Sequence, residues 1–405
     1  MKPGSDKSST SPHLQPFSPE EYDERLSRVR AGMVKRGLDG LLISSPDNIC
    51  YLTGLSYHGY FAYQLLVVPQ NGQPCLITRA MEGPTIRDEV PNVRHCPYSD
   101  SAGSGGDMSE QYVEPVNTTV QTLSEEGLSN ARIGFEANSS YLPYGIAQRD
   151  QDSLSHSEFI DASDIVGECR LVKSLQEIEY VRRAAKITDA MMMSAIATTG
   201  PGVLQRDVMA AIYQAMLHHG GTYPAFVPLL RTTDNIDHEH STWEDKPLKN
   251  TEMVFIELSG CVARYHAPAG RLIFVGEAPK HTQEAQVICD AAFYASVDAL
   301  KPGVLARDVY AAWQKVVDDS GIVGYHRHHC GYSVGIGFPP SWSGSGVPKS
   351  LRHDSNMEIC AGMVFHMMSA LYHTGKGDYF ISNCAVVTEN GYEVLTKTPH
   401  ALTVR

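Results

Sequence analysis

An internal repeat is the feature that most restricts how this chain can fold. The segment Pro201–Ala211 reads Pro-Gly-Val-Leu-Gln-Arg-Asp-Val-Met-Ala-Ala, and Pro302–Ala312 is identical to it at nine of eleven positions. Each copy predicts a Pro-Gly turn that leads into an amphipathic helix. Chance identity at this level is improbable, so an internal duplication is the economical account. Two copies are too few for a solenoid, and we expect a pseudo-twofold α/β domain with the functional site where the halves meet.

The composition is that of a globular protein with ordinary domains. The 405 residues, 42% hydrophobic and 20% charged, suffice for two or three domains. A net charge of −13 argues against nucleic acid or an anionic membrane surface as a partner. No apolar run is long enough to span a bilayer, and Met1–Gln15 lacks the apolar core of a signal peptide. The nine cysteines form no Cys-x-x-Cys pair, so we expect reduced thiols in a cytoplasmic protein.

Helix and strand patterns divide the chain into two domains. Residues 1–17 are polar and rich in Ser and Pro, which predicts a disordered tail. Residues 18–165 alternate a helix with short strands and are predicted to form an α/β domain. A boundary is expected at Asp164–Leu171, and a long helix at Ser174–Thr198 then opens a second domain, residues 172–405. The elements predicted in the first domain are a helix at Tyr22–Arg36 and strands at Leu38–Ser44, Gln64–Pro69, Pro74–Thr78 and Ile133–Glu136.

One carboxylate interrupts an otherwise apolar predicted strand, Met253–Leu258, which reads Met-Val-Phe-Ile-Glu-Leu. Burying such a group costs several kcal/mol, on the order of 2–7 even for a neutral polar group, unless it is paired or used. The alternative is that Glu257 points into water from a half-exposed strand. That alternative fits only in part, because Phe255 would share the wet face. Glu257 is therefore a candidate catalytic residue.

The order of these landmarks along the chain resembles one family. The run Asp47-Asn-Ile-Cys-Tyr-Leu-Thr-Gly54 is similar to the N-terminal domain of creatinase and prolidase. The duplicated part, Ser174–Arg405, resembles the pita-bread fold shared by creatinase, aminopeptidase P, prolidase and methionine aminopeptidase. The resemblance implies an α/β (α+β) class, with a creatinase-like α/β domain followed by a pseudo-twofold pita-bread domain. It also implies a homodimer in which the partner's N-terminal domain covers the site.

The resemblance bears directly on metal binding. Peptidases of this fold hold two metal ions through two Asp, one His and two Glu. Carried onto this chain, the first Asp is Glu257, and the others fall at or near Pro268, Pro339, Met368, and Ser382 or Asn383. Proline, methionine and serine cannot replace carboxylate or imidazole donors. We therefore expect no family-type metal site and no cofactor.

Several long runs narrow the resemblance further. They are Tyr223–Leu230, Ser241–Asp245, Glu257–Cys261 with Arg264–His266, Gly335–Trp342 and Gly362–His366. These runs resemble the metal-independent ectoine hydrolases. The resemblance implies that Glu257 acts as a nucleophile in opening a small cyclic amidine at a C–N bond. The leading substrate is ectoine, with N-acetyl-diaminobutyrate as the product. The chain departs from these enzymes at Asp378–Cys384, where they carry acidic residues on the final strand.

Histidines and aromatic residues complete the candidate site. The resemblance implies a proton-transfer histidine ahead of the strand, and His240 is the first choice, with His266 the second. A plain surface histidine is the alternative for His240, which lies in a polar run. The candidates for substrate binding are His366, Tyr265, Tyr332, Trp342, Phe226 and, in the aromatic loop Tyr57–Tyr63 of the first domain, Tyr60. Core or lid packing is the alternative for the aromatic residues.

Other functions stay open at this level. An Xaa-Pro dipeptidase would need the metal cluster, and a creatinase-like amidinohydrolase would use the same carboxylate on another substrate. A non-catalytic peptide-binding module of the same fold would give no reason for a buried Glu/His pair. Ectoine, hydroxyectoine, creatine-like molecules and dipeptides therefore all remain candidates for the substrate.

Overall fold

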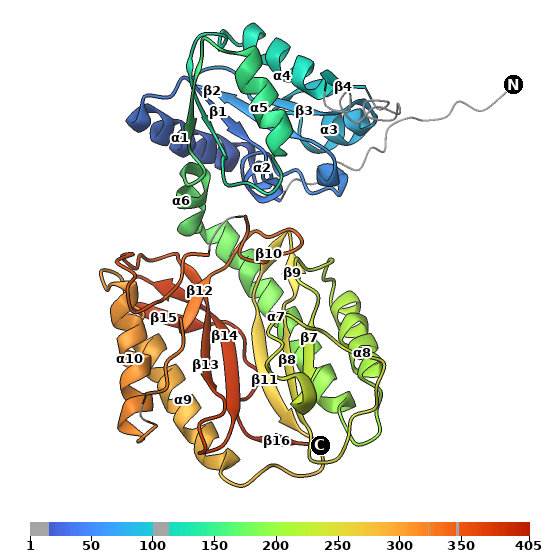
Figure 1. The fold of residues 1–405 in the computed structure, drawn as a ribbon, viewed down its shortest axis with the longest axis vertical. Helices are drawn as coiled ribbons and strands as arrows, with labels where there is room; N and C mark the ends of the chain where they lie inside the picture. The colour runs from blue at the N-terminus through green and yellow to red at the C-terminus, as the bar shows by residue number, and fades with distance from the viewer. Residues whose placement is uncertain (1–15, 100–112, 323, 346–347) are drawn as a thin grey trace, which may run out of the picture. The chain divides into compact units, whose positions relative to one another are not determined.

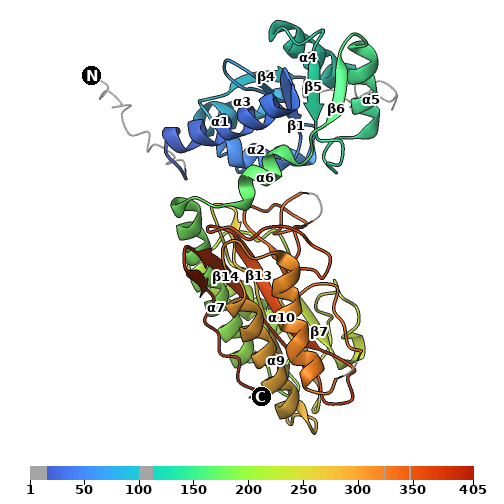
Figure 2. The same cartoon turned by 90° about the vertical axis from the view of Figure 1, so that its left-hand side faces the viewer.

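The computed structural model describes residues 16–99, 113–322, 324–345 and 348–405, and Figures 1 and 2 show it from two sides. The chain divides into two compact units, Met1–Cys169 and Arg170–Arg405, and this division lies inside the stretch where a boundary is predicted. Most of the predicted tail lies outside the described residues. Its last residue, Phe17, is buried beneath the guanidinium of Arg25 at 3.9 Å, so the ordered chain includes this part of the predicted tail.

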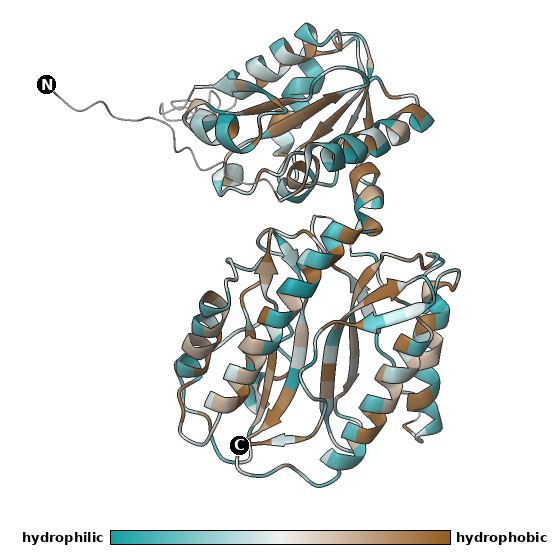
Figure 3. Ribbon diagram, turned by 180° about the vertical axis from the view of Figure 1, so that it is seen from behind, coloured by the Kyte–Doolittle hydropathy of each residue, from teal (hydrophilic) through white to brown (hydrophobic). Residues whose placement is uncertain are grey.

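The N-terminal unit is built on one six-stranded mixed sheet with the strand order β4-β3-β2-β1-β5-β6. Its strands are coloured mainly as hydrophobic in Figure 3, as expected for a sheet that helices cover. The strands are β1 Gly40–Ile43, β2 Leu65–Pro69, β3 Cys75–Arg79, β4 Arg94–Tyr98, β5 Arg132–Phe135 and β6 Glu158–Asp161. The helices are α1 Pro19–Arg36, α2 Pro46–Thr53, α3 Gly83–Glu89, α4 Val113–Glu125, α5 Tyr144–Ser153 and, at the boundary, α6 Ile165–Leu171.

Helix α2 lies where the sequence predicts neither a helix nor a strand. All eight of its residues are buried, and Pro46 begins it in the position that proline favours. The buried carboxylate of Glu136 accepts hydrogen bonds from the backbone N–H groups of Ser44 and Ser45, both at 2.8 Å, and from Asn48. These bonds satisfy polar groups at the start of the helix that no helical carbonyl can reach. The helix is therefore stabilised by a residue far along the chain.

The C-terminal unit contains an eight-stranded sheet, a separate two-stranded sheet and four long helices. The order of the strands in its main sheet is β12-β13-β14-β11-β8-β7. The helices are α7 Leu175–Thr198, α8 Gln205–His218, α9 Thr282–Asp298 and α10 Ala306–Asp319. The strands are β7 Leu229–Thr232, β8 Met253–Leu258, β9 Cys261–Val262, β10 Tyr265–His266, β11 Ala269–Phe274, β12 Gly331–Ser333, β13 Val364–Leu371, β14 Tyr379–Thr388, β15 Gly391–Val394 and β16 Thr403–Val404.

The predicted duplication is visible in this unit. Gly202 and Gly303 adopt left-handed backbone angles, with φ of 77° and 84°. The N–H of each donates to a backbone carbonyl at 2.8 Å, that of Leu248 and of Ile359 respectively, and each turn leads into its helix, α8 or α10. The strands β7, β8 and β11 mirror β12, β13 and β14 in the sheet order. The pseudo-twofold α/β domain is therefore confirmed, and its halves meet between β11 and β14.

The two faces of the sheet have different surroundings. Helix α7 packs on β8 and β11, and helix α9 packs on β13 and β14. On β13 the side chains alternate between the faces, so Met367 and Ser369 point opposite to His366 and Met368. The indole of Trp313 on α10 donates to Ser369 at 3.0 Å, which marks the helix-covered face. Among the described residues, no helix has both the length and the apolarity that crossing a membrane would require.

Candidate active site on the C-terminal sheet

A row of four residues crosses the middle of the sheet on the face that α9 does not cover. Glu257 pairs with Gly270, Gly270 with Ser382, and Ser382 with Met368. Directly paired residues share a face and lie about 5 Å apart. A Cβ on Gly270 would lie 2.4 Å from the Phe380 ring and 2.9 Å from the Ser382 hydroxyl. Glycine therefore keeps open the space between Glu257 and Ser382.

A second row lies two residues further along the same strands, about 7 Å from the first. Here the rings of Phe255 and Phe380 pack with centroids 4.8 Å apart. The guanidinium of Arg231 stacks on Phe255 at 4.0 Å, and Tyr372 stacks on Phe380 at 6.4 Å. This row therefore forms an aromatic floor with one cation and one hydroxyl above it.

Both rows face one cavity of about 150 Å³. Liquid water occupies about 30 Å³ per molecule, so this space suits a small organic molecule. The lining residues are Leu229, Arg231, Glu239, His240, Phe255, Glu257, Arg327, His328, His329, Tyr332, Met368, Tyr372 and Phe380. The cavity thus combines carboxylates, guanidinium groups, imidazoles and an apolar wall in one place.

Glu257 is held in this cavity as a weakly acidic carboxyl group. Its side chain is only 12% exposed. Burial raises its pKa to about 7, with Arg231 opposing the rise, Glu239 adding to it and Arg327 opposing it. The carboxyl group therefore changes its charge within the physiological range, which is typical of functional positions.

A chain of hydrogen bonds fixes His366 beside Glu257. The Trp342 indole donates to the Tyr332 hydroxyl at 2.9 Å, and this hydroxyl lies 3.0 Å from Nδ1 of His366. Because an indole only donates, we assign the Tyr332 hydroxyl as a donor to Nδ1, and the imidazole proton to Nε2. That nitrogen lies 2.7 Å from the Ser382 hydroxyl and therefore donates to it.

The imidazole of His366 is neutral where it contacts Glu257. Burial lowers the pKa of His366 to about 3, and the nearby His329 acts in the same direction. The 3.7 Å between Nε2 and the Glu257 carboxylate is therefore no ion pair, and it exceeds hydrogen-bond length. His366 thus acts on the site by orienting Ser382 and by presenting a polar edge to the carboxylate.

Comparison with known proteins identifies the family. Residues 179–389 match the metallopeptidase family M24, and residues 25–172 match the creatinase/prolidase N-terminal domain. The chain belongs to metallopeptidase family M24. It is 31% identical to the ectoine hydrolase of Halomonas elongata, across 96% of this chain and 98% of that protein.

Peptidases of the M24 family are also similar to this chain. A Xaa-Pro dipeptidase from Pyrococcus horikoshii is 24% identical over 94% of this chain and 99% of its own length. The structure of a Xaa-Pro dipeptidase from Bacillus anthracis superposes with a TM-score of 0.80 at 21% identity, covering 95% of this chain and all of that one. The second likeness shows a shared fold alone.

The side chains in the row around Glu257 do not fit a pair of metal ions. Beside Glu257 the row offers no side chain at Gly270, a hydroxyl at Ser382 and a thioether at Met368. Hard divalent cations require several oxygen donors, chiefly carboxylates, and such a set is missing from this row. Among the described residues, no group of three or more His, Cys, Asp or Glu side chains is arranged to hold a metal ion.

Several of the predicted site residues lie close together in or beside the cavity. Glu257, His240 and Tyr332 line the cavity, and His366 adjoins Glu257. His240 is exposed at the rim, where its ring stacks on Phe226 with centroids 6.1 Å apart. Phe226 in turn packs on Trp342 at 5.0 Å. Phe226 and Trp342 therefore support His240 and Tyr332 from behind.

Two of the predicted site residues, His266 and Tyr265, form hydrogen bonds to other parts of the protein. His266 is buried with both ring nitrogens occupied: Nε2 accepts from the Ala225 N–H at 2.9 Å, and Nδ1 faces the Gly335 carbonyl at 3.4 Å. Tyr265 donates its hydroxyl to Glu177 on α7 at 2.7 Å. Neither residue lines the cavity. These hydrogen bonds hold β10 in place, and the predicted roles of both residues toward a substrate stay predictions.

Tyr60 belongs to the N-terminal unit. It lies on the short 3-10 helix η1, Gly59–Phe61, and its ring packs against Tyr141 at 5.9 Å. Its predicted contact with a substrate involves the other unit or a partner chain, and it stays a prediction.

The sequence interpretation missed several cavity residues. They are Arg231, Glu239, Arg327, His328, His329 and Tyr372. Arg231 did carry a signal, because it is a charged residue in the apolar run Leu229-Leu-Arg-Thr232, just as Glu257 is in its own strand. Tyr372 follows the end of β13, and no pattern in the sequence places it opposite Arg231.

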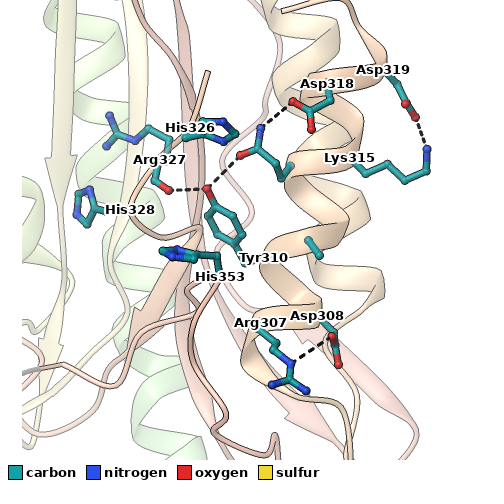
Figure 4. Close-up of a pocket in the computed structure, with 12 residues that line it drawn as sticks. Arg307, Asp308, Tyr310, Lys315, Asp318, Asp319, His326, Arg327, His328 and His353 are labelled. Carbon is teal, nitrogen blue, oxygen red and sulfur yellow. Dashed lines mark hydrogen bonds and ion pairs between the residues drawn. The ribbon is translucent and has the colours of Figure 1, made fainter. Parts of the chain in front are cut away.

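A larger cavity of about 860 Å³ lies along α10. Four of its charged side chains are already paired, as Figure 4 shows: Lys315 with Asp319 at 2.6 Å and Arg307 with Asp308 at 4.0 Å. The Tyr310 hydroxyl donates to the backbone carbonyl of Arg327 at 2.6 Å, while the Arg327 guanidinium points away from α10. That guanidinium also lines the smaller cavity, which we take as the candidate active site.

Proposed function

We propose that this protein is a metal-independent hydrolase that opens a C–N bond of a small cyclic amidine, with ectoine as the leading substrate. One observation supports this proposal above the others. The buried carboxylate of Glu257 faces a small cavity, and the row of the sheet around it offers only a hydroxyl and a thioether, where M24 peptidases would need metal ligands. The likeness to an ectoine hydrolase along nearly the whole chain supports the same conclusion.

The proposed chemistry begins with charge pairing. A protonated amidine binds beside the ionised Glu257, and the bound cation lowers the pKa of that carboxyl group below its value in the free protein. A carboxylate oxygen then attacks the amidine carbon. One ring C–N bond breaks, and the departing nitrogen takes a proton. Because Glu257 is held on a strand inside a sheet, orientation contributes much of the rate.

Water completes the proposed reaction. A histidine removes a proton from water, which attacks the adduct, and the Glu257 carboxylate is regenerated. His240 is the candidate for this base, because it lines the cavity and is open to water. The overall change adds one water to the amidine and gives an amide and an amine, which for ectoine is N-acetyl-diaminobutyrate.

The second candidate is a Xaa-Pro dipeptidase, which the similarity to dipeptidases favours. That reaction in the M24 family relies on two metal ions, and the row around Glu257 offers one carboxylate for them. A creatinase-like amidinohydrolase would use the same groups as the cyclic amidine reaction, so only the substrate separates these two.

The test is an assay of four compounds: ectoine, hydroxyectoine, creatine and the dipeptide Ala-Pro, each with and without a chelator. We expect ectoine to be consumed at a rate that the chelator does not change. Glu257→Gln should abolish this activity, and Glu284→Gln, at an exposed position on α9, should not. Dipeptide cleavage that stops with the chelator would overturn the proposal in favour of the dipeptidase. Turnover of creatine alone would assign the amidinohydrolase.

A further inference from the structure

Three buried polar atoms indicate that the cavity also binds a ligand group other than the reacting amidine. Nε of Arg231, Nδ1 of His329 and the hydroxyl of Tyr372 are buried without a hydrogen-bond partner among the described residues. All three residues line the cavity that holds Glu257. Buried polar atoms nearly always have partners, so several such atoms around one cavity indicate that an occupant supplies them.

The position of Arg231 makes it a fixed cation inside this cavity. The residue is 3% exposed, its Nη1 donates to the Ile236 carbonyl at 2.6 Å, and its guanidinium lies flat on Phe255. These contacts hold the planar group in one orientation. The unused Nε–H belongs to the edge with which arginine typically binds carboxylates.

The partners of this arginine leave room for an anion. Within the described part of the chain it pairs with one carboxylate, that of Glu239, whose oxygen lies 3.5 Å from Nη1 and whose side chain is 59% exposed. An ion pair with such an exposed partner is weak. A second guanidinium, that of Arg327, lines the same cavity. The Nε–H lies on the other edge of the guanidinium from Nη1, so an incoming carboxylate can bind it without displacing Glu239.

We propose that Arg231, assisted by Arg327 and Tyr372, binds a carboxylate on the substrate, so that the substrate carries a cation at one end and a carboxylate at the other. This inference rests on the proposed function and names the class of amidine. Glu257 lies in the first row of the sheet and Arg231 above the second, about 7 Å along the strands. A small molecule with opposite charges a few bonds apart spans that distance, whereas an uncharged or singly charged ring leaves one end unpaired.

The test compares two probes that differ only in the carboxylate: ectoine and 2-methyltetrahydropyrimidine, the same ring without it. Calorimetric titration in the Glu257→Gln background avoids turnover. With Arg231 present, we expect ectoine to bind about 10- to 100-fold more tightly than the bare ring, the range for a charged hydrogen bond. Arg231→Met should abolish this preference, and Arg231→Lys should retain part of it.

A matched control is Arg307→Met, which removes an arginine outside the cavity and should leave the preference unchanged. Should Arg231→Met fail to fold, Arg231→Lys and Tyr372→Phe carry the test, each reducing the preference. An equal effect of the Arg231 variants on both probes, or binding of neither probe, overturns the inference. Turnover is measured separately with Glu257 intact. If the protein prefers the probe with the carboxylate but does not turn it over, the proposed reaction is wrong and the proposed carboxylate site stands.

Discussion

Glu257 shows how strongly burial can shift the charge state of one side chain. In water its carboxyl group would be ionised at neutral pH, with a pKa near 4.5, whereas in the cavity burial raises that value to about 7. A cationic substrate reverses this effect by stabilising the charged form. Under the proposed function we therefore expect Glu257 to ionise when the substrate binds, so that its protonation is coupled to binding.

The same shift predicts a stability change for Glu257→Gln. The folded state holds the Glu257 proton more tightly than the unfolded chain does, so ionisation favours unfolding as the pH rises from about 4.5 through about 7. Glutamine cannot ionise. We expect the variant to match the wild type at pH 4.5 and to exceed its free energy of unfolding by up to about 3 kcal/mol at pH 8. Urea unfolding at both pH values measures the difference, and an advantage at low pH would contradict it.

The hydrogen-bonded chain through Tyr332 makes a second prediction for a single residue. Tyr332→Phe removes one hydroxyl and leaves the Trp342 indole N–H and Nδ1 of His366 without their partners. A buried polar group left alone costs about 1–3 kcal/mol, so we expect a loss of stability of that size. The rate kcat should fall as well, because His366 and Ser382 lose their orientation. Tyr392→Phe, at a hydroxyl bound to Asp298 on the surface, is the control.

Single residues differ in how far the sequence reveals them. Glu257 is found because a charge stands out in an apolar strand, and Arg231 could have been found in the same way. His266 resembles a catalytic residue in its motif, yet its backbone partners, Ala225 and Gly335, come from distant parts of the chain. Hydrogen-bond partners of this kind are a property of tertiary packing, and a sequence motif does not contain them.

At the scale of elements, the strand β11 is shaped by the absence of a side chain. Gly270→Ala would place a methyl group against the ring of Phe380, at 2.4 Å, in the space between Glu257 and Ser382. Overpacking of this kind typically costs about 1–3 kcal/mol. We expect both lower stability and a loss of activity, measured by urea unfolding and by the ectoine assay.

The control for this change is Gly145→Ala on helix α5. No atom lies within 4 Å of a Cβ at that position, and alanine favours helices over glycine. This variant should be as stable as the wild type or slightly more stable. If Gly270→Ala behaved in the same way, the cavity would not depend on the space at β11.

Strands with strong apolar patterns were predicted well, and elements that depend on distant contacts were not. The strand Met253–Leu258 was predicted with the bounds that β8 has, and the long helix from Ser174 is α7 with its Ser cap and capping box. Helix α2 was missed because its eight residues show no one-sided pattern, all of them being buried. Its start is satisfied by Glu136, ninety residues from Pro46, which local periodicity cannot show.

At the scale of the whole molecule, the family resemblance predicts a homodimer in which the partner's N-terminal domain covers each site, and Tyr60 of that domain is a candidate for substrate binding. Mixing subunits tests this expectation. A chain with Glu257→Gln and a chain with Tyr60→Ala should each be inactive alone. In a mixed dimer one of the two sites would combine an intact Glu257 with an intact Tyr60 from the other subunit. A statistical mixture should therefore recover about a quarter of the wild-type activity.

The subunit-mixing experiment can also contradict this expectation. Recovery of activity requires that the two chains exchange subunits, which co-purification of the untagged variant with an affinity-tagged copy of the other would verify, while sedimentation at about twice the 44.4 kDa chain mass would verify the dimer. Exchange without any recovery would show that Tyr60 acts within its own chain or has no part in the site.

The mirrored order of strands has a consequence for the product. In the row Glu257–Gly270–Ser382–Met368, the outer positions come from β8 and β13, which are counterparts in the two halves. If both halves had kept the same residue there, a ring could enter in either of two orientations and yield two isomeric products. Because Glu257 offers a carboxylate on the β8 side and Met368 a thioether on the β13 side, the two orientations of the ring are not equivalent. We therefore expect one regioisomer from an unsymmetrical amidine, because the two halves of the duplicated domain carry different residues at these positions.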